Sequence, residues 1–501
     1  MREPGLVREG VFRFLNLERS LTNAADWNDP DARKLWLYNL HYFNDLNAAG
    51  RERRDPECRR LIDRWIAENP PGTGTGWEPY PLSLRIGNWI KWACSGFLLS
   101  HTAVDSLAVQ ARYLAKSLEY HLLGNHLLAN AKALVFAGLF FEGREPGQWL
   151  RTGLTILEKE LPEQVLADGG HFERSPMYHS IVLEDVLDLL AISRVFPSGV
   201  STQLQDHWAR VAGEMLRWLA VMCHPDGDIA FFNDASLGVA LTPLQLRACA
   251  DTLGVLPARI SEKDLIRLEP SGYVRVRRGA WSVILDVAPV GPDYTPGHAH
   301  ADTLSFELSW NAHRVLTNSG TSIYAGGAEQ RAWERSTAAH NTVEIDAQNS
   351  SEVWDTFRVA RRARPFGQEA GESDGGSYIA GAHDGYRRLR GSPVHRRVIE
   401  TDERTLRVRD TISGHGSHRV AGYFHLHPDI HLEEDAGGGW KVCLPGGALL
   451  RMTGRDGLRL QREEGTYAPE FGRLIPRAVL AWRVERRLPL SATVELIEDR
   501  R

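Results

Sequence analysis

The sequence predicts a protein of two domains, helical in its N-terminal half and built of antiparallel β-sheets in its C-terminal half. In the first half the apolar side chains recur with a helical period, as at Leu204, Trp208 and Val211. In the second half the period changes to two, and strands recur to the C-terminus without intervening helices. A chain of 501 residues is also too long for a single core. We therefore predict a helical domain over residues 1–268 and a domain of stacked antiparallel sheets over residues 269–501.

Several apolar stripes in the helical half are separated by loops. Leu183, Val186 and Leu190 form one stripe, which follows the helix-breaking pair Ser175-Pro176. Residues 122–141 are nearly continuously apolar and small, which predicts a helix buried between neighbours. Because Pro, Gly and Asp recur in the connecting loops, we expect antiparallel helix pairs.

The strands of the second half alternate apolar and basic side chains. Tyr273–Arg277 and Leu406–Arg409 follow this pattern, and Asp456-Gly457 is a strong hairpin turn. The basic positions are expected to face solvent, and the alternative is contact with an acidic polymer. These positions are Arg275, Arg277, Arg407 and Arg409.

The composition excludes some classes of partner. A net charge of −5 and a pI near 6.5 give no global basic field, so nucleic acid is not expected as a partner. The 15 Trp residues point weakly toward carbohydrate, because aromatic rings stack on sugars as well as filling cores. The five Cys are odd in number and never closely spaced, which argues against a disulfide framework or a cysteine zinc site and fits a reducing compartment.

No targeting or membrane segment is visible in the sequence. The first residues lack the apolar stretch of a signal peptide, so we expect a cytoplasmic protein. A chain from which a leader had been removed would look the same and would be periplasmic. No segment approaches the roughly 18 apolar residues of a membrane span. The sequence does not determine the oligomeric state.

Two histidines stand close together at the start of a predicted strand. His298 and His300 are separated by one residue, and the alternating run Leu304–Leu308 follows. Side chains two residues apart on an extended backbone point the same way, so both imidazoles are expected to serve one site. A third imidazole, His340, opens another alternating run. A single His is usually a surface or hydrogen-bonded core residue, whereas this arrangement favours chemistry.

Two segments of the helical half carry more polar and aromatic groups than packing requires. Asn125 and His126 open the long apolar helix. Asn is a good helix N-cap, but the neighbouring His is harder to explain as packing. The second segment either lines a sugar cleft or packs helices together, and its candidate residues are Trp77, Tyr80, Arg85 and Asn88.

A Gly-rich loop over residues 168–179 carries many ionisable groups, including Glu173, Arg174 and Tyr178. Such a loop is a plausible edge of a substrate site. The alternative is a solvated turn in which Ser175-Pro176 starts the next helix.

Together these motifs resemble the heparinase II/III family, polysaccharide lyases related to heparinase and to the exolytic alginate lyases. The resemblance covers nearly the whole chain and rests on motifs in a consistent order. These motifs are Trp77–Trp92, Gly124–Leu134, Gly169–Tyr178, the His298/His300 segment and Thr337–Val343. It implies an N-terminal (α/α) toroid followed by an antiparallel β-sandwich, with the active site in the cleft between them. The change of period near residue 270 agrees with that division.

The resemblance also implies catalytic roles. Such lyases cleave a uronic-acid polymer by β-elimination, which requires stabilising an enediolate, taking the proton α to the carboxylate and protonating the leaving oxygen. Asn125 and His126 match the family's carboxylate-neutralising pair. Tyr178 matches a tyrosine that acts as acid, and in some geometries as base, for which Arg174, His126 or His298 would have to lower its pKa. His298 matches the catalytic histidine, either as base or as partner of the carboxylate.

By the same resemblance, His300 and His340 are two zinc ligands. The third is usually an Asp, and Asn318 stands at that position here. A neutral amide is a weaker zinc ligand than a carboxylate, so the site either binds a structural zinc weakly or is a hydrogen-bonded cluster. The following segment places Tyr324 and Arg335 near the cleft, where Arg side chains could bind an acidic sugar.

We therefore predict a β-eliminating polysaccharide lyase that acts on an acidic polysaccharide or oligosaccharide and is linked to surface-polysaccharide metabolism. The main alternative is a non-catalytic carbohydrate-binding or assembly protein on the same shell. A metal-dependent hydrolase is a further alternative, because amidohydrolase barrels also carry a His-x-His motif on their first strand. Such a barrel needs parallel strands that alternate with helices, and no helical period follows the motif here. The presence of Asn125, His126, Tyr178 and His298 favours activity.

Overall fold

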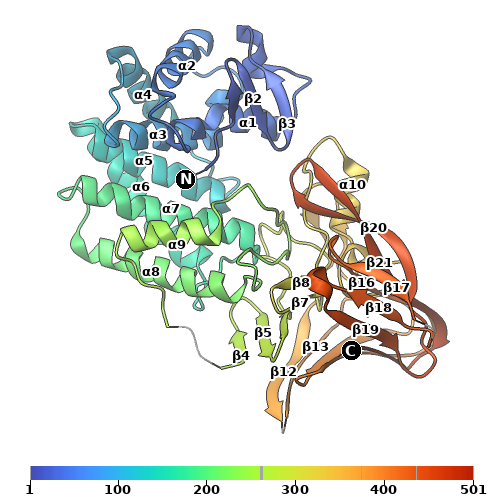
Figure 1. The fold of residues 1–501 in the computed structure, drawn as a ribbon. Helices are drawn as coiled ribbons and strands as arrows, with labels where there is room; N and C mark the ends of the chain where they lie inside the picture. The colour runs from blue at the N-terminus through green and yellow to red at the C-terminus, as the bar shows by residue number, and fades with distance from the viewer. Residues whose placement is uncertain (1, 260–262, 374, 436, 500–501) are drawn as a thin grey trace. The chain divides into compact units, whose positions relative to one another are not determined.

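The computed structural model describes residues 2–259, 263–373, 375–435 and 437–499 (Figure 1). The chain forms two compact units that interleave along the sequence. The first unit comprises Met1–Val165, Ser180–Leu216 and Leu244–Ala258, and the second comprises Leu166–His179, Arg217–Pro243 and Arg259–Arg501. After helix α9 the chain returns to strands at Leu265, close to the predicted change of period.

Helices make up most of the first unit, which also carries a small antiparallel sheet, β1 (Leu6–Arg8), β2 (Val11–Phe14) and β3 (Leu17–Ser20). The helices up to residue 252 are α1 (Lys34–Tyr42), α2 (Asp55–Glu68), α3 (Pro79–Cys94), α4 (His101–Leu114), α5 (Gly124–Phe140), α6 (Arg144–Gln164), α7 (Pro176–Val195), α8 (Thr202–Val221) and α9 (Pro243–Thr252).

Helix α5 is buried along most of its length, as its apolar sequence predicts. It packs against α3, α4 and α6. Two glycines allow the close approach of α6, because a Cβ at Gly153 would lie 2.6 Å from Ala131 O and one at Gly138 would lie 2.6 Å from Leu150 N. At the other end of α5, Gln164 Nε2 of α6 donates to Gly124 O at 2.9 Å, which holds the N-terminal turn that carries Asn125.

The second unit is built mainly of antiparallel sheets, and it also contains the short helix α10 (Ala328–Glu334). A five-stranded sheet has the order β4-β5-β6-β7-β8, an eight-stranded sheet the order β12-β13-β14-β15-β22-β19-β18-β17, and a four-stranded sheet the order β20-β21-β16-β9. β10 (Val353–Trp354) and β11 (Arg358–Val359) form a separate hairpin. The other strands are β4 (Leu265–Leu268), β5 (Tyr273–Arg278), β6 (Trp281–Asp286), β7 (Phe306–Trp310), β8 (His313–Leu316), β9 (Val343–Ile345), β12 (Pro365–Ser373), β13 (Gly376–His383), β14 (Val394–Thr401), β15 (Thr405–Ser413), β16 (Ser417–His425), β17 (His431–Glu434), β18 (Trp440–Cys443), β19 (Leu449–Gly454), β20 (Gln461–Glu470), β21 (Arg473–Arg487) and β22 (Leu490–Glu498).

One hydrophobic core joins the three large sheets, which confirms the predicted stacking of antiparallel sheets. Val283 of the five-stranded sheet, Val408 of the eight-stranded sheet and Leu480 of the four-stranded sheet all belong to it. The alternation predicted for β15 is present, since Leu406 and Val408 are buried between more exposed neighbours.

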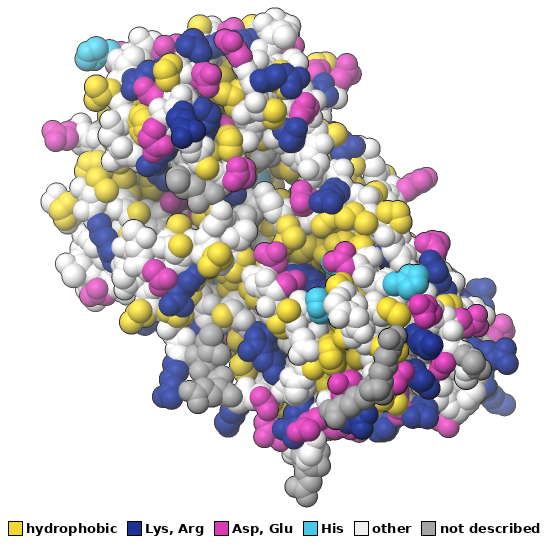
Figure 2. Space-filling view, viewed as in Figure 1, with side chains coloured by type: hydrophobic (Ala, Val, Ile, Leu, Met, Phe, Trp, Pro, Cys, Tyr) yellow, Lys and Arg dark blue, Asp and Glu magenta, His cyan; other side chains and the backbone are white. Residues whose placement is uncertain are grey.

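The surface mixes charges of both signs, and Figure 2 shows Lys and Arg side chains interspersed with Asp and Glu over the visible face. For one arginine, the prediction that it faces solvent is wrong. Arg275 is 2% exposed and donates to Ala220 O and Val221 O, both at 2.9 Å. Within the described residues, no helix combines the length and the apolar character that crossing a membrane requires.

Candidate active site

The segment around His298 and His300 is a loop, and the predicted strand starts only at Phe306. The two imidazoles nevertheless meet, at a carboxylate that the sequence analysis missed. His298 Nδ1 lies 2.8 Å from Asp234 Oδ2, and His300 Nε2 lies 2.8 Å from Asp234 Oδ1. The convergence therefore comes from a shared partner and not from an extended backbone.

Asp234 is fully buried at the centre of this cluster. Both terminal nitrogens of Arg331 donate to its carboxylate, and Thr321 Oγ1 donates to Oδ1 at 3.2 Å. Burial alone raises the pKa of Asp234, but Arg331 and the two imidazoles outweigh that effect and hold the pKa well below its usual range. The side chain is therefore an anion that orders its neighbours.

The carboxylate fixes the proton on His298. Because Asp234 accepts the Nδ1–H, the lone pair of His298 stays on Nε2. The side chain of His298 is 17% exposed, and its Nε2 lies 3.8 Å from Glu173 Oε2. An imidazole held in one tautomer by a buried carboxylate, with the other nitrogen accessible, has the form of a general base.

Tyr178 lies against this base. It stands on the first turn of α7, where Ser175 Oγ accepts the Tyr178 backbone N–H and caps the helix. The Tyr178 and His298 ring centroids are 3.9 Å apart, and Tyr178 Oη is 3.0 Å from Tyr324 Oη. Burial raises the pKa of Tyr178 well above its ordinary value, and Tyr324 and Asp234 raise it further. The phenol therefore carries its proton and is suited to donate it.

The pKa of Tyr178 is raised, so the condition under which it could act as a base is not met. Arg174 donates instead to Ser271 O at 3.1 Å and Phe172 O at 2.9 Å. The loop over residues 168–179 is largely buried and is not a solvated turn. Glu173 and Arg174 are 4% and 8% exposed, so Arg174 supports the loop and does not present a free guanidinium to a substrate.

Arg335, a second predicted substrate ligand, is also structural. It is fully buried and donates to backbone carbonyls, including Ala299 O at 3.0 Å and Asp355 O at 2.9 Å. Tyr324 is partly exposed and stays a candidate, since its hydroxyl meets Tyr178 and its ring lies 5.0 Å from the Arg331 guanidinium carbon.

A second cluster lies at the start of α5 in the helical unit. His126 packs its ring on Tyr80, with centroids 4.4 Å apart, and Asn125 Nδ2 donates to Tyr80 Oη at 3.5 Å. His126 Nδ1 donates to Glu119 Oε1 at 3.0 Å, and Asn130 Nδ2 donates to Glu119 Oε2 at 2.9 Å. Asn125 lies inside the helix and does not cap it. Glu119, which the sequence analysis missed, therefore positions His126.

Three other candidates of the helical unit have structural roles. Trp77 is buried and donates to Asn69 O at 3.2 Å. Arg85 is fully buried, with its guanidinium carbon 3.8 Å from the centroid of the Trp65 ring. Asn88 donates to Tyr42 O at 2.8 Å. These three side chains pack the helices, so their predicted role in substrate binding is not supported.

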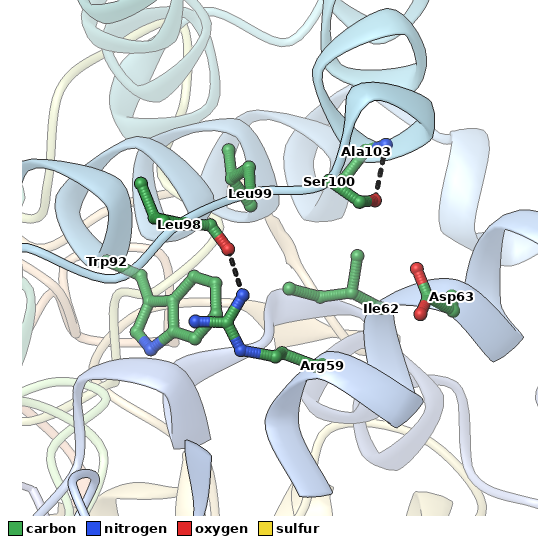
Figure 3. Close-up of a pocket in the computed structure, with 8 residues that line it drawn as sticks. All are labelled: Arg59, Ile62, Asp63, Trp92, Leu98, Leu99, Ser100 and Ala103. Atoms are coloured by element: carbon green, nitrogen blue, oxygen red, sulfur yellow. Dashed lines mark hydrogen bonds between the residues drawn. The ribbon is translucent and has the colours of Figure 1, made fainter. Parts of the chain in front are cut away.

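A shallow pocket between α2, α3 and α4 lies apart from this cluster (Figure 3). Trp92 lines it 12 residues beyond Tyr80 on α3, which corresponds to about 18 Å along the helix axis. Arg59 covers the Trp92 ring and donates to Leu98 O. The remaining lining residues are Ile62, Asp63, Leu99, Ser100 and Ala103.

Zinc binding by His300, Asn318 and His340 stays a prediction. His300 Nδ1 and His340 Nε2 face each other at 3.1 Å, and His340 Nδ1 donates to Ser336 O at 2.6 Å. The Asn318 amide donates to Phe231 O at 2.9 Å and accepts from Asn341 N at 3.2 Å. Among the described residues, no three His, Cys, Asp or Glu side chains are grouped to hold a metal ion. The mechanism below therefore contains no metal step.

Two family models match the chain. Heparinase II/III N-terminus covers residues 26–253, and Heparinase II/III-like, C-terminal covers residues 261–493. Together the two models span nearly the whole chain. The chain belongs to the heparinase II/III-like family.

Relatives agree with this assignment. A heparin-sulfate lyase of Pedobacter heparinus is 26% identical over 367 residues, which cover 65% of this chain and 54% of that protein. The FtsZ-localized protein C of Caulobacter vibrioides is 27% identical over 430 residues, covering 78% of this chain and 69% of that protein. The chain spans 37% to 54% of the length of the curated heparin-sulfate lyases it matches.

A crystal structure of heparinase III matches 93% of this chain and 78% of its own, with a TM-score of 0.76 and 21% identity. This likeness confirms the fold class, a helical (α/α) toroid followed by a β-sandwich.

Proposed function

We propose that the protein is a polysaccharide lyase that cleaves a uronic-acid-containing acidic glycan by β-elimination. The observation that carries the proposal is the contact between His298, whose tautomer Asp234 fixes, and the protonated phenol of Tyr178. β-Elimination needs such a pair, because one group takes a proton and the other gives one. The heparin-sulfate lyases among the relatives support the substrate class.

In this mechanism His298 Nε2 takes the proton from the carbon α to the substrate carboxylate. The electrons of the C–H bond form the new C=C bond, and the bond from the β carbon to the glycosidic oxygen breaks with its electrons on oxygen. Tyr178 donates its hydroxyl proton to that oxygen, and Tyr324, 3.0 Å away, can return a proton to Tyr178. Asp234 stabilises the imidazolium that forms on His298.

Asn125 and His126 are proposed to neutralise the substrate carboxylate. An amide N–H and an imidazole N–H are both hydrogen-bond donors to carboxylate oxygens, and such bonds strengthen as charge develops in the enediolate. Glu119 orients the imidazole for this role.

A non-catalytic role is the second candidate. The observation behind it is the name of one relative, the FtsZ-localized protein C, which states where that protein is found and names no reaction; this relative aligns with 78% of this chain, against 65% for the lyase from Pedobacter heparinus. On this reading the shell binds a glycan without cleaving it.

The test is the ultraviolet absorbance of the unsaturated uronate product, measured over a panel of uronic-acid polysaccharides and oligosaccharides with the wild type and Tyr178→Phe. The variant removes only the hydroxyl, so the fold is expected to persist while turnover falls at least about a thousandfold. Equal turnover in the variant would refute the role of Tyr178. Binding without any new absorbance in the wild type would instead favour the non-catalytic role.

A further inference from the structure

The β10–β11 hairpin presents an aromatic ring and a guanidinium side by side. Trp354 and Arg358 are direct cross-strand partners, so their side chains project from the same face. Trp354 is 56% exposed, which makes it the most exposed Trp of the described residues, and Arg358 is exposed as well. Within the described part of the chain, Arg358 makes no ion pair. Phe357 on the same hairpin is 42% exposed, so the exposed apolar surface comprises two aromatic rings and not a single one.

Two buried arginines hold the turn of this hairpin. Arg335 donates to Asp355 O at 2.9 Å, Thr356 O at 3.1 Å and Arg358 O at 3.2 Å. Arg331 Nε donates to Thr356 O at 3.1 Å. The carbonyls of a short exposed turn are usually left to water, whereas here four donor contacts fix them. The hairpin is therefore pre-organised, which reduces the entropy lost when a ligand binds.

The same hairpin reaches the proposed base. The Phe357 ring centroid lies 5.6 Å from that of His298 and 5.3 Å from that of Tyr324. Arg331, which holds the turn, also binds Asp234. Trp354 and Arg358 thus stand on a rigid element that contacts the catalytic cluster.

The surroundings of the hairpin add positive charge. Arg361 and Arg364 follow β11 and are exposed. The side chain of Arg361 is 73% exposed and has only a long contact, 3.6 Å, with Glu352. A polyanion is the ligand that a row of exposed guanidinium groups favours, since each group can pair with a carboxylate or sulfate in bidentate form.

We propose that this hairpin is a binding platform for the acidic glycan beyond the residue that reacts. Trp354 stacks on the face of a sugar ring, and Arg358 pairs with an acidic group of the same or the next sugar. The proposal rests on the proposed function for its ligand class, an acidic glycan. It adds a site that the catalytic residues do not require, and it predicts that chain length, and not only the cleaved linkage, sets affinity.

The test uses the full chain carrying Tyr178→Phe, which binds without turnover, and titrates it with heparan sulfate polymer and with its tetrasaccharide. Adding Trp354→Ala is expected to weaken polymer binding about tenfold, the effect of losing one aromatic stacking contact. Trp354→Phe keeps a ring and should recover most of the loss. Arg358→Gln should weaken binding about fivefold at low salt and less at high salt, because exposed charges are screened. Arg404, on the β14–β15 turn, is also exposed, so Arg404→Gln is the matched control and should change nothing.

Unchanged polymer affinity in both Trp354→Ala and Arg358→Gln would overturn the platform. The outcome for catalysis is separate, because it is measured on the chain with Tyr178 intact. If the hairpin variants carry out elimination with an unchanged KM, the binding-platform proposal is overturned and the lyase proposal stands. If heparan sulfate binding depends on Trp354 but no elimination occurs, the lyase proposal is overturned and the binding-platform proposal stands. Absence of both binding and elimination overturns both proposals.

Discussion

Replacing Asp234 by Asn is expected to remove nearly all turnover while hardly changing the volume of the side chain. The carboxylate accepts the Nδ1–H of His298, whereas an amide nitrogen in the same place would donate. The proton of His298 would then move to Nε2, and the lone pair that takes the substrate proton would point at residue 234. The imidazolium formed in the reaction would also lose its counter-charge.

Two magnitudes follow from this geometry. In a serine protease, the same exchange behind a catalytic histidine lowers kcat about ten-thousand-fold, which corresponds to about 5 kcal/mol of barrier. Folding stability falls as well, because Arg331 is 1% exposed and would lose the carboxylate it binds with both terminal nitrogens. Removing one partner of a buried ion pair costs about 3–5 kcal/mol.

Initial rates at saturating substrate, with urea unfolding in parallel, separate these effects. Thr321→Val is the control, since it removes a 3.2 Å donor to the same carboxylate and leaves the charge in place, so its kcat should stay within about threefold of the wild type. His298→Gln removes the base without touching Arg331, and it must show the same large loss. A folded Asp234→Asn protein that turns over within tenfold of the wild type would refute the assignment of His298 as base.

Two further predictions concern the helical unit. Glu119→Gln is expected to lower kcat about tenfold with KM little changed, because an amide does not accept hydrogen bonds from both His126 and Asn130 as the two carboxylate oxygens do. Initial-rate kinetics measures this effect. A fall in stability with an unaltered kcat would mean that Glu119 only supports the fold. Acid is expected to destabilise this unit through His41. Burial, and to a smaller extent Arg85, lowers the pKa of His41 from 6.5 to about 3. Between these two values the unfolded chain binds a proton that the folded chain does not, so the free energy of unfolding falls as the pH falls. Between pH 6.5 and 5 the free energy of unfolding should fall by roughly 2 kcal/mol, which urea unfolding followed by Trp fluorescence can measure. An unchanged pH dependence in His41→Phe would contradict this prediction.

The order of helices and strands could be predicted because burial imposes a period on the sequence. Leu406 and Val408 occupy the core face of β15, which is the face that the alternating pattern predicts to be buried. The loops carry no such period. The run Leu304–Leu308 alternates, yet Leu304 has a φ of +66° in a turn, and β7 begins two residues later. Both faces of this run are buried, so its polar residues are core residues and gave a misleading pattern.

The site could be predicted only where a motif exists. The motifs located Asn125, His126, Tyr178 and His298, and these residues lie in two hydrogen-bonded clusters. Asp234 belongs to no periodic segment. Its one available signal was a carboxylate placed two residues after the apolar run Ile229–Phe232, a position where burial and a cationic partner could have been expected.

Arginine shows the limit of residue type as evidence. Arg85, Arg174 and Arg335 are all predicted from the sequence as candidate substrate-binding residues, with helix packing as the alternative for Arg85. All three are buried and hold backbone carbonyls or pack on an aromatic ring. Whether a guanidinium serves the chain or a ligand depends on tertiary burial, which residue type does not encode.

Arg331 shows why these structural arginines still matter for catalysis. Its terminal nitrogens hold Asp234, and its Nε holds Thr356 O in the turn of the hairpin. Arg335, one helical turn later, binds Ala299 O, next to His298, and the carbonyls of the same turn. In a buried network each member is fixed by the others, so a displaced turn also displaces the carboxylate that sets the tautomer of His298. A sequence change that displaces the backbone of this turn is therefore expected to disturb the orientation of the base as well, whereas a change confined to the exposed side chains of the hairpin is not.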